Sequence, residues 1–83
     1  MMNVSKEKFH KLLLMGFDIE FDFNEAFYSI TTFEDNNSIR FSVANNKKWC
    51  KEVDSIEKVD NCLIGEKRLI EIIESFPDEE IYY

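Results

Sequence analysis

Glycine and proline are scarce in this 83-residue chain, which holds two Gly and one Pro. Flexible linkers and low-complexity segments are rich in these residues, so the sequence predicts neither of them. The two glycines, Gly16 and Gly65, stand far apart in the sequence. This spacing excludes a glycine-rich phosphate loop, and with it nucleotide binding by that route.

Histidine and cysteine are nearly as rare, with one His and two Cys. His10 alone cannot form a usual zinc site or a histidine pair, and we interpret it as a partly covered helix residue. Cys50 and Cys62 have neither a metal-binding nor a redox spacing, which favours reduced thiols and leaves a disulfide between them as the alternative. No nucleophile motif or distinguished carboxylate pair is present, so we expect no enzyme, no catalytic residue, no metal and no other cofactor.

Long apolar runs are also missing. No stretch approaches the roughly 20 apolar residues of a membrane span. Lysines precede the apolar run 12–15, but this run is too short for a signal peptide and no small-residue cleavage site follows it. We therefore expect a cytoplasmic protein that is neither secreted nor bound to a membrane.

Apolar and aromatic side chains, by contrast, are plentiful. Hydrophobic residues make up 45% of the chain and include eight Phe, which predicts a folded protein despite the net charge of -7. The length predicts one domain over residues 1–83 with a single core. The negative charge predicts a soluble protein without direct nucleic-acid binding.

The first predicted element is a helix that Ser5 can cap and Gly16 can end. Its apolar side chains fall on one stripe at helical spacing. They are Phe9, Leu12 and Leu13.

Residues 17–23 alternate large apolar with acidic side chains, which is the pattern of a half-buried strand. Asn24 and Glu25 predict a two-residue turn into a second strand, in a register that pairs Phe21 with Tyr28. Glu25 is a poor residue for the positive φ of such a turn, so a longer loop of the same parity is the alternative.

The second turn is predicted over residues 34–37, which would place Ile30 opposite Phe41. Residues 45–46 are predicted as a third turn, because Asn tolerates positive φ. They lead into a short fourth strand over 47–53.

The register of the fourth strand has two alternatives. A two-residue loop would turn Cys50 toward the core and Trp49 toward the outer face of the sheet. A three-residue loop would bury Trp49 instead, because one added residue reverses the face of every side chain.

The remaining residues predict helices. Asp54 can cap one or two helical turns within 54–61, a brief extended link follows at 62–65, and residues 66–76 predict a helix that ends at a proline. The tail 78–83 either adds an edge strand or hangs free. The helix stripe consists of Leu69, Ile72, Ile73 and Phe76.

We therefore predict an α+β fold. It has an N-terminal helix, an antiparallel β-meander of three to four strands, and one or two C-terminal helices packed on one sheet face.

The segments "DIEFDFNEAFYSI" and "IGEKRLIEII" resemble small acidic proteins of Gram-positive bacteria and their mobile elements. In those proteins an acidic-aromatic strand, an Asn-Gly hairpin and a closing amphipathic helix recur, and most are uncharacterised. Here Glu25 replaces the expected Gly and Glu66 an expected Lys. The resemblance implies a fold and a genomic setting, and no activity.

Charge divides the predicted sheet. Residues 18–35 contain six acids and no Lys or Arg, whereas residues 36–53 contain four bases and one acid. The outer face would carry acids at one edge, aromatics in its middle and bases at the other edge. The candidate interface residues on this face are Asp18, Glu20, Asp22, Phe27, Phe33, Arg40 and Trp49.

The acidic row is not a calcium loop. Alternate positions of 18–24 carry oxygen ligands, but the positions that require Gly and a bidentate acid hold Phe23 and Ser29. A solvated strand face is the simpler interpretation.

Three functions are compatible with this surface. The first is a non-enzymatic interaction module that binds a protein partner, or a second copy as a homodimer, through the aromatic face. The second is an acidic nucleic-acid mimic that occupies a DNA- or RNA-binding protein, and the third is a small enzyme. Alternatively, a helix or the tail covers the aromatic face within the chain, or turn twist separates its Phe residues.

Overall fold

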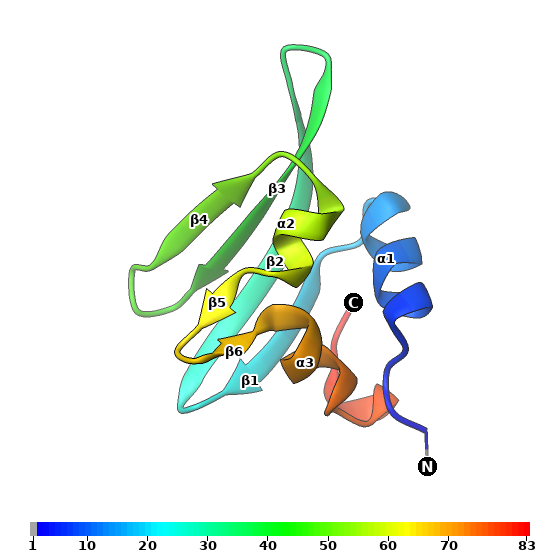
Figure 1. Cartoon of the computed structure of the whole chain (residues 1–83), viewed down its shortest axis with the longest axis vertical. Helices are drawn as coiled ribbons and strands as arrows, with labels where there is room; N and C mark the ends of the chain where they lie inside the picture. Colours follow the sequence, from blue (N-terminus) through cyan, green and yellow to red (C-terminus); the bar gives the residue numbers. More distant parts are fainter. Residues whose placement is uncertain (1) are drawn as a thin grey trace.

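Alternating apolar positions build one antiparallel sheet in the computed structural model, which describes residues 2–83. The four strands follow one another across the sheet in chain order (Figure 1). They are β1 (Ile19–Phe23), β2 (Ala26–Asp35), β3 (Ser38–Asn45) and β4 (Cys50–Val53).

The helices and a small ribbon cover one face of this sheet. Figure 1 shows α2, α3 and the ribbon crossing in front of the strands, with α1 beside them. These elements are α1 (Lys6–Leu14), α2 (Ile56–Asp60), the strands β5 (Leu63–Ile64) and β6 (Lys67–Arg68), α3 (Leu69–Glu74) and the 3-10 turn η1 (Asp78–Glu80). The predicted α+β fold, in which one helix precedes the antiparallel sheet in the chain and further helices follow it, is confirmed.

Helix α1 has the predicted ends. The Ser5 hydroxyl accepts a hydrogen bond from the Lys8 N–H at 3.1 Å, which satisfies one donor of the first turn. Gly16 has a φ of 89°, and the Phe17 N–H donates to the Leu12 carbonyl at 3.0 Å. This closing geometry is the one that favours glycine after a helix.

The β1–β2 hairpin confirms the two-residue turn and its register. Asn24 and Glu25 have φ values of 50° and 63°, and Phe21 pairs with Tyr28. The positive φ at Glu25 is unusual for a residue that is neither Gly nor Asn. The strand begins at Ile19, two residues later than the predicted strand.

The β2–β3 turn is shorter than predicted. Asn36 and Asn37 alone form it, with φ values of 52° and 66°, because Asn tolerates the left-handed region. The register therefore differs by two residues, and Ile30 faces Val43 rather than Phe41. A shift of two residues keeps every side chain on its predicted face.

The β3–β4 turn follows the three-residue alternative. Residues 46–48 form the loop, and Lys48 has a φ of 66°. The Asn45 side chain accepts hydrogen bonds from the backbone N–H groups of Lys47 and Trp49. Trp49 therefore lies on the helix-covered side and packs against the core, and Cys50 is exposed. The two-residue alternative, with Cys50 inward and Trp49 outward, is wrong.

The cap of α2 is one residue later than predicted. Ser55, rather than Asp54, accepts the hydrogen bond from the Lys58 N–H, at 3.2 Å. Asp54 instead pairs with the Lys58 ammonium at 2.8 Å. The hydrogen bond from that ammonium lowers the pKa of the Asp54 carboxyl.

Helix α3 begins at Leu69, later than the predicted start at residue 66. Gly65 has a φ of 66°, and the chain turns there so that Arg68 pairs with Leu63 in the ribbon. The link predicted at 62–65 is therefore one arm of a hairpin. Because Lys67 and Arg68 are paired in this hairpin, the helix begins about one turn later in the chain than predicted.

The C-terminal tail forms neither the predicted edge strand nor a free end: after the 3-10 turn it makes one isolated bridge to the β1 edge of the sheet. The Tyr82 N–H donates to the Glu20 carbonyl at 2.9 Å, and the Glu20 N–H donates to the Tyr82 carbonyl at 2.8 Å. Ile81 is buried beside this bridge.

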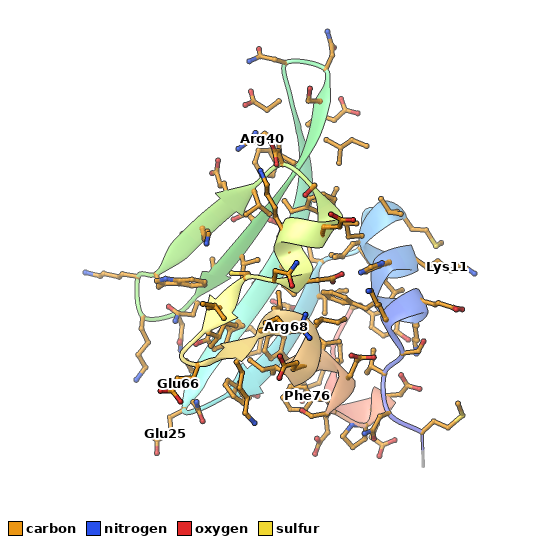
Figure 2. All side chains as sticks on the ribbon, viewed as in Figure 1. Lys11, Glu25, Arg40, Glu66, Arg68 and Phe76 are labelled. Atoms are coloured by element: carbon orange, nitrogen blue, oxygen red, sulfur yellow. The ribbon has the colours of Figure 1, made fainter. Side chains whose placement is uncertain are left out.

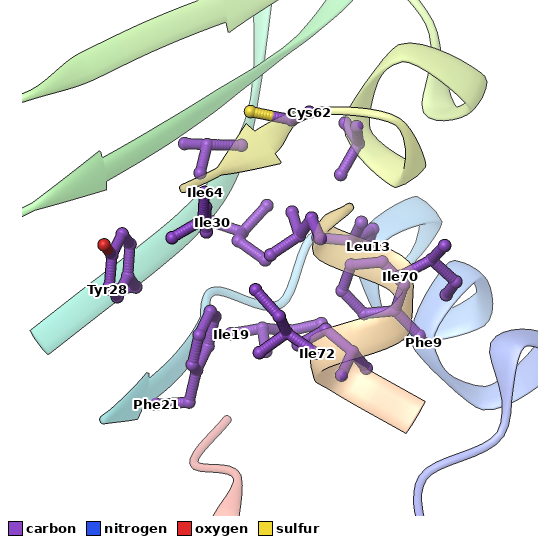
Figure 3. Close-up of a cluster of buried hydrophobic side chains, with 14 of the residues drawn as sticks. Phe9, Leu13, Ile19, Phe21, Tyr28, Ile30, Cys62, Ile64, Ile70 and Ile72 are labelled. Carbon is purple, nitrogen blue, oxygen red and sulfur yellow. The ribbon is translucent and has the colours of Figure 1, made fainter. Parts of the chain in front are cut away.

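One hydrophobic core fills the space between the sheet and the helices (Figure 3). Phe21 stacks on Tyr28 with ring centroids 5.4 Å apart. The largest fully buried side chains are Phe9, Phe21, Leu13, Ile19, Ile30, Leu69, Ile72, Ile73, Val43, Val59 and Cys62.

The core borders one buried charged group. Among residues 2–83, Asp60 of α2 is the only charged residue that is buried, with 5% of its surface exposed. His10 of α1 contacts both of its carboxylate oxygens at 2.8 Å, and the Lys6 ammonium lies 4.0 Å away. His10 is partly covered, as predicted, but its partner is not evident from the sequence.

Candidate interaction surface

The side of the sheet away from the helices is formed by alternate residues of all four strands, and we call it the outer face. None of these residues is buried, and its two Phe residues do not pack against the core. The outer face consists of Glu20, Asp22, Phe27, Ser29, Thr31, Phe33, Arg40, Ser42, Ala44, Cys50 and Glu52. The helices pack on the opposite side of the sheet, and the tail reaches the outer face only at its β1 edge, where Tyr82 pairs with the backbone of Glu20. Phe27 and Phe33 are each partly buried.

The two aromatic residues of the outer face lie at opposite ends of β2. Phe27 pairs with Asp22 at one end, and Phe33 pairs with Arg40 at the other. Six residues of extended chain separate the two rings by about 20 Å. The expected aromatic middle is therefore replaced by small side chains, such as Ser29, and the aromatics mark the two ends.

Trp49 does not belong to the outer face. It pairs with Asn45 on the helix-covered side and contacts Tyr28 edge to face, with ring centroids 6.3 Å apart. Lys51 shares that side, because residues two apart on a strand point the same way. The candidate position of Trp49 on the outer face, which depended on the two-residue loop, is wrong, and Arg40 is the base that remains on this face.

The acidic residues lie at the β1 edge, as predicted. Asp22 is exposed within β1, and Asp18 is exposed just before it. Glu20 is partly covered where the tail residue Tyr82 pairs with its backbone. Figure 2 shows Arg40 and Glu25 toward opposite ends of the molecule. The acid of the β1–β2 turn, Glu25, is therefore well separated from Arg40.

The two thiols differ in their surroundings. Cys50 is exposed on the outer face, with its sulfur 3.5 Å from the Ser42 hydroxyl oxygen. Cys62 is buried, and burial raises the pKa of its thiol. Both thiols are free, so no disulfide joins Cys50 to Cys62.

A second surface lies on the other side of β4 and has no counterpart in the sequence prediction. A pocket of about 230 Å³ lies between the β3–β4 turn and the ribbon. Its walls include Tyr28, Trp49 and Leu63. Sequence reasoning missed it because these three residues are distant in the chain and meet only in the folded protein.

Metal clusters and membrane-spanning helices are two further features that would define a site in residues 2–83. No group of three or more His, Cys, Asp or Glu side chains there is arranged to hold a metal ion. No helix in the same range is long and apolar enough to cross a membrane. The fold and surfaces define a two-layer α+β domain with one uncovered sheet face.

Comparison of the chain with known protein families, with curated proteins and with solved structures found no match.

Proposed function

We propose that this protein is a non-enzymatic, cytoplasmic interaction module that pairs with a second copy of itself through the outer face. The observation that carries the proposal is the uncovered sheet face with two Phe side chains on it. Large apolar side chains on an open sheet gain free energy when a partner covers them. The free thiols Cys50 and Cys62 are compatible with a reducing compartment.

The charges at the two ends of the outer face favour a second copy as the occupant. Asp22 lies next to Phe27, and Arg40 lies next to Phe33. Two copies can stack face to face around a two-fold axis that lies in the plane of the interface and crosses the middle of the face. This axis brings the Asp22 end of one copy over the Arg40 end of the other. Each such dimer contains the acid–base contact twice, and small residues such as Ser29 let the two sheets approach closely.

The net charge sets the condition under which this pairing occurs. Each chain carries -7, so two chains repel one another at low ionic strength. At about 0.15 M salt the Debye length falls to about 8 Å, which screens this repulsion while contacts within the interface persist. The dimer is therefore expected at physiological salt.

Sedimentation equilibrium of single variants tests the proposal. Phe27→Ser and Phe33→Ser should each raise the dissociation constant of the dimer at least about tenfold, equivalent to about 1.4 kcal/mol. Leu14→Ser is the matched control, because Leu14 is 63% exposed on α1 and lies off the outer face. Circular dichroism verifies that each variant folds. The proposal fails if both Phe variants associate as strongly as Leu14→Ser.

A further inference from the structure

Strand β4 forms an open edge of the sheet. Within residues 2–83 it pairs with β3 alone. The Asn45 N–H donates to the Trp49 carbonyl at 2.9 Å, so the next pair, Ala44 with Cys50, is of the non-hydrogen-bonded kind. The backbone N–H and C=O groups of Cys50 and Glu52 therefore point away from β3, where a further strand can pair with them.

The opposite edge of the sheet is capped. Tyr82 of the tail exchanges two backbone hydrogen bonds with Glu20 of β1. This bridge opposes edge-to-edge pairing at β1. Within residues 2–83 the β1 edge thus carries a backbone pairing at Glu20, whereas the β4 edge carries none.

An anchor pocket adjoins the open edge on the helix-covered side. The pocket has a volume of about 230 Å³, and its lining includes Tyr28, Trp49 and Leu63. A cavity of about 150 Å³ is already large enough for a benzene ring. Leu63 is 58% exposed, so one apolar wall of the pocket faces solvent. The pocket has the volume for one aromatic or branched side chain, and its lining combines apolar side chains such as Trp49 and Leu63 with the polar Asn45 and Lys47.

The charge beside this edge is positive, although the chain as a whole is acidic. Lys47, Lys48 and Lys51 fall within five residues that contain no acid. Lys47 lines the pocket, and Lys51 projects from β4 on the same side as Trp49. Lysines along an edge oppose pairing with an identical edge, whereas an acidic segment neutralises them.

We propose that the β4 edge and its pocket bind an extended acidic segment of a partner protein by strand addition. The segment has the pattern acid-x-apolar-x-acid, because residues two apart on a strand point to the same side. The central apolar side chain occupies the pocket at Trp49, and one acid lies beside Lys51. Backbone hydrogen bonds to Cys50 and Glu52 hold the segment in register.

The single Trp of the chain allows a direct binding measurement. The probe is the blocked peptide Thr-Glu-Thr-Phe-Thr-Glu-Thr, and its matched control carries Lys in place of both Glu residues. At about 0.15 M salt, where local charges outweigh the net charge, the acidic peptide should give a saturable change in Trp49 emission. The basic peptide should bind at least about tenfold more weakly.

Two changes separate strand addition from a general charge effect. Lys51→Glu should weaken binding of the acidic peptide at least about tenfold, whereas Lys11→Glu on α1 makes the same charge change and should leave binding unaltered. Methylation of the amide nitrogens of all four Thr residues removes the donors that an antiparallel segment offers to Cys50 and Glu52, and should abolish saturation. The proposal is overturned if Trp49 emission does not change up to about 1 mM peptide. Equal binding of the methylated peptide, or of the acidic peptide by Lys51→Glu, also overturns it.

Discussion

The Nε2 atom of His10 lies 2.8 Å from both carboxylate oxygens of Asp60 and joins α1 to α2 across fifty residues of chain. The Asp60 side chain is 7% exposed and that of His10 is 23% exposed. A buried carboxylate is tolerated because a hydrogen-bond donor satisfies it. This contact fixes how α1 sits against the short second helix.

Removal of the His10 side chain should destabilise the fold. His10→Ala leaves the Asp60 carboxylate buried with the Lys6 ammonium 4.0 Å away. The expected loss in the free energy of unfolding is about 1–3 kcal/mol, measured by urea denaturation. Lys58→Ala breaks the exposed pair with Asp54 and should cost less, because exposed pairs contribute little. An equal or smaller loss for His10→Ala would show that the buried pair is not important for stability.

The β1–β2 turn offers a stabilising substitution. Glu25 has a φ of 63°, which costs free energy for a residue with a Cβ atom. Glu25→Gly should raise the free energy of unfolding by about 0.5–1 kcal/mol after the greater chain entropy of Gly is included. Glu34→Gly, within strand β2, is the control and should lower it. A decrease for Glu25→Gly would contradict the turn geometry.

The strand order and the sheet faces could be predicted because alternation and turn residues act locally. The β1–β2 register follows from matching the apolar positions, such as Phe21 with Tyr28. The predicted β2–β3 turn is two residues too long, because Glu34 and Asp35 give no apolar signal. Each side chain nevertheless lies on its predicted face of the sheet, since the register differs by an even number of residues. The start of α3 could not be predicted because the strands β5 and β6 before it have only two residues each. A strand of two residues is too short to show an alternating pattern in the sequence.

The candidate surface was predictable only in part. Phe27, Phe33 and Arg40 lie on the outer face because they share parity on paired strands. Trp49 could not be placed, since a single residue in the β3–β4 loop decides its side of the sheet. The pocket at Trp49 and the buried carboxylate of Asp60 depend on contacts between distant parts of the chain, and no local pattern reveals them.

The two thiols should react at different rates with a thiol reagent. Cys50 is exposed, whereas Cys62 is buried and burial raises the pKa of its thiol. One thiol per chain should react quickly, and the second should react at least about 100-fold more slowly, through opening of the fold. Mass spectrometry of the labelled peptides identifies each thiol, and denaturant should equalise the rates. Fast labelling of Cys62 in the folded chain would contradict its burial.

The raised pKa of Cys62 also predicts a pH dependence. Because its folded pKa lies above the ordinary value of 9.0, the contribution of this thiol to stability is complete below that value. It should be lost as the pH rises toward the folded pKa, and Cys62→Ala should remove this part of the alkaline decline. Urea denaturation of both proteins across this pH range measures it, and identical declines would contradict the assignment.

A charge exchange tests the orientation of the proposed dimer. Arg40→Glu should raise the dissociation constant about tenfold, since two contacts per dimer turn from attraction to repulsion. Addition of Asp22→Arg should restore most of the affinity. Lys11→Glu makes the same change in net charge on α1, and its dissociation constant should stay near that of the wild type. If Arg40→Glu and Lys11→Glu behave alike, the two ends of the outer face do not meet.

The most direct test of the central claim is the solution mass of the wild-type chain by light scattering on a sizing column. At about 0.15 M salt and about 100 μM protein, pairing through the outer face predicts a mass approaching twice the 9.9 kDa of one chain. A mass of one chain at this protein concentration, at both low and high salt, would contradict self-association through the outer face.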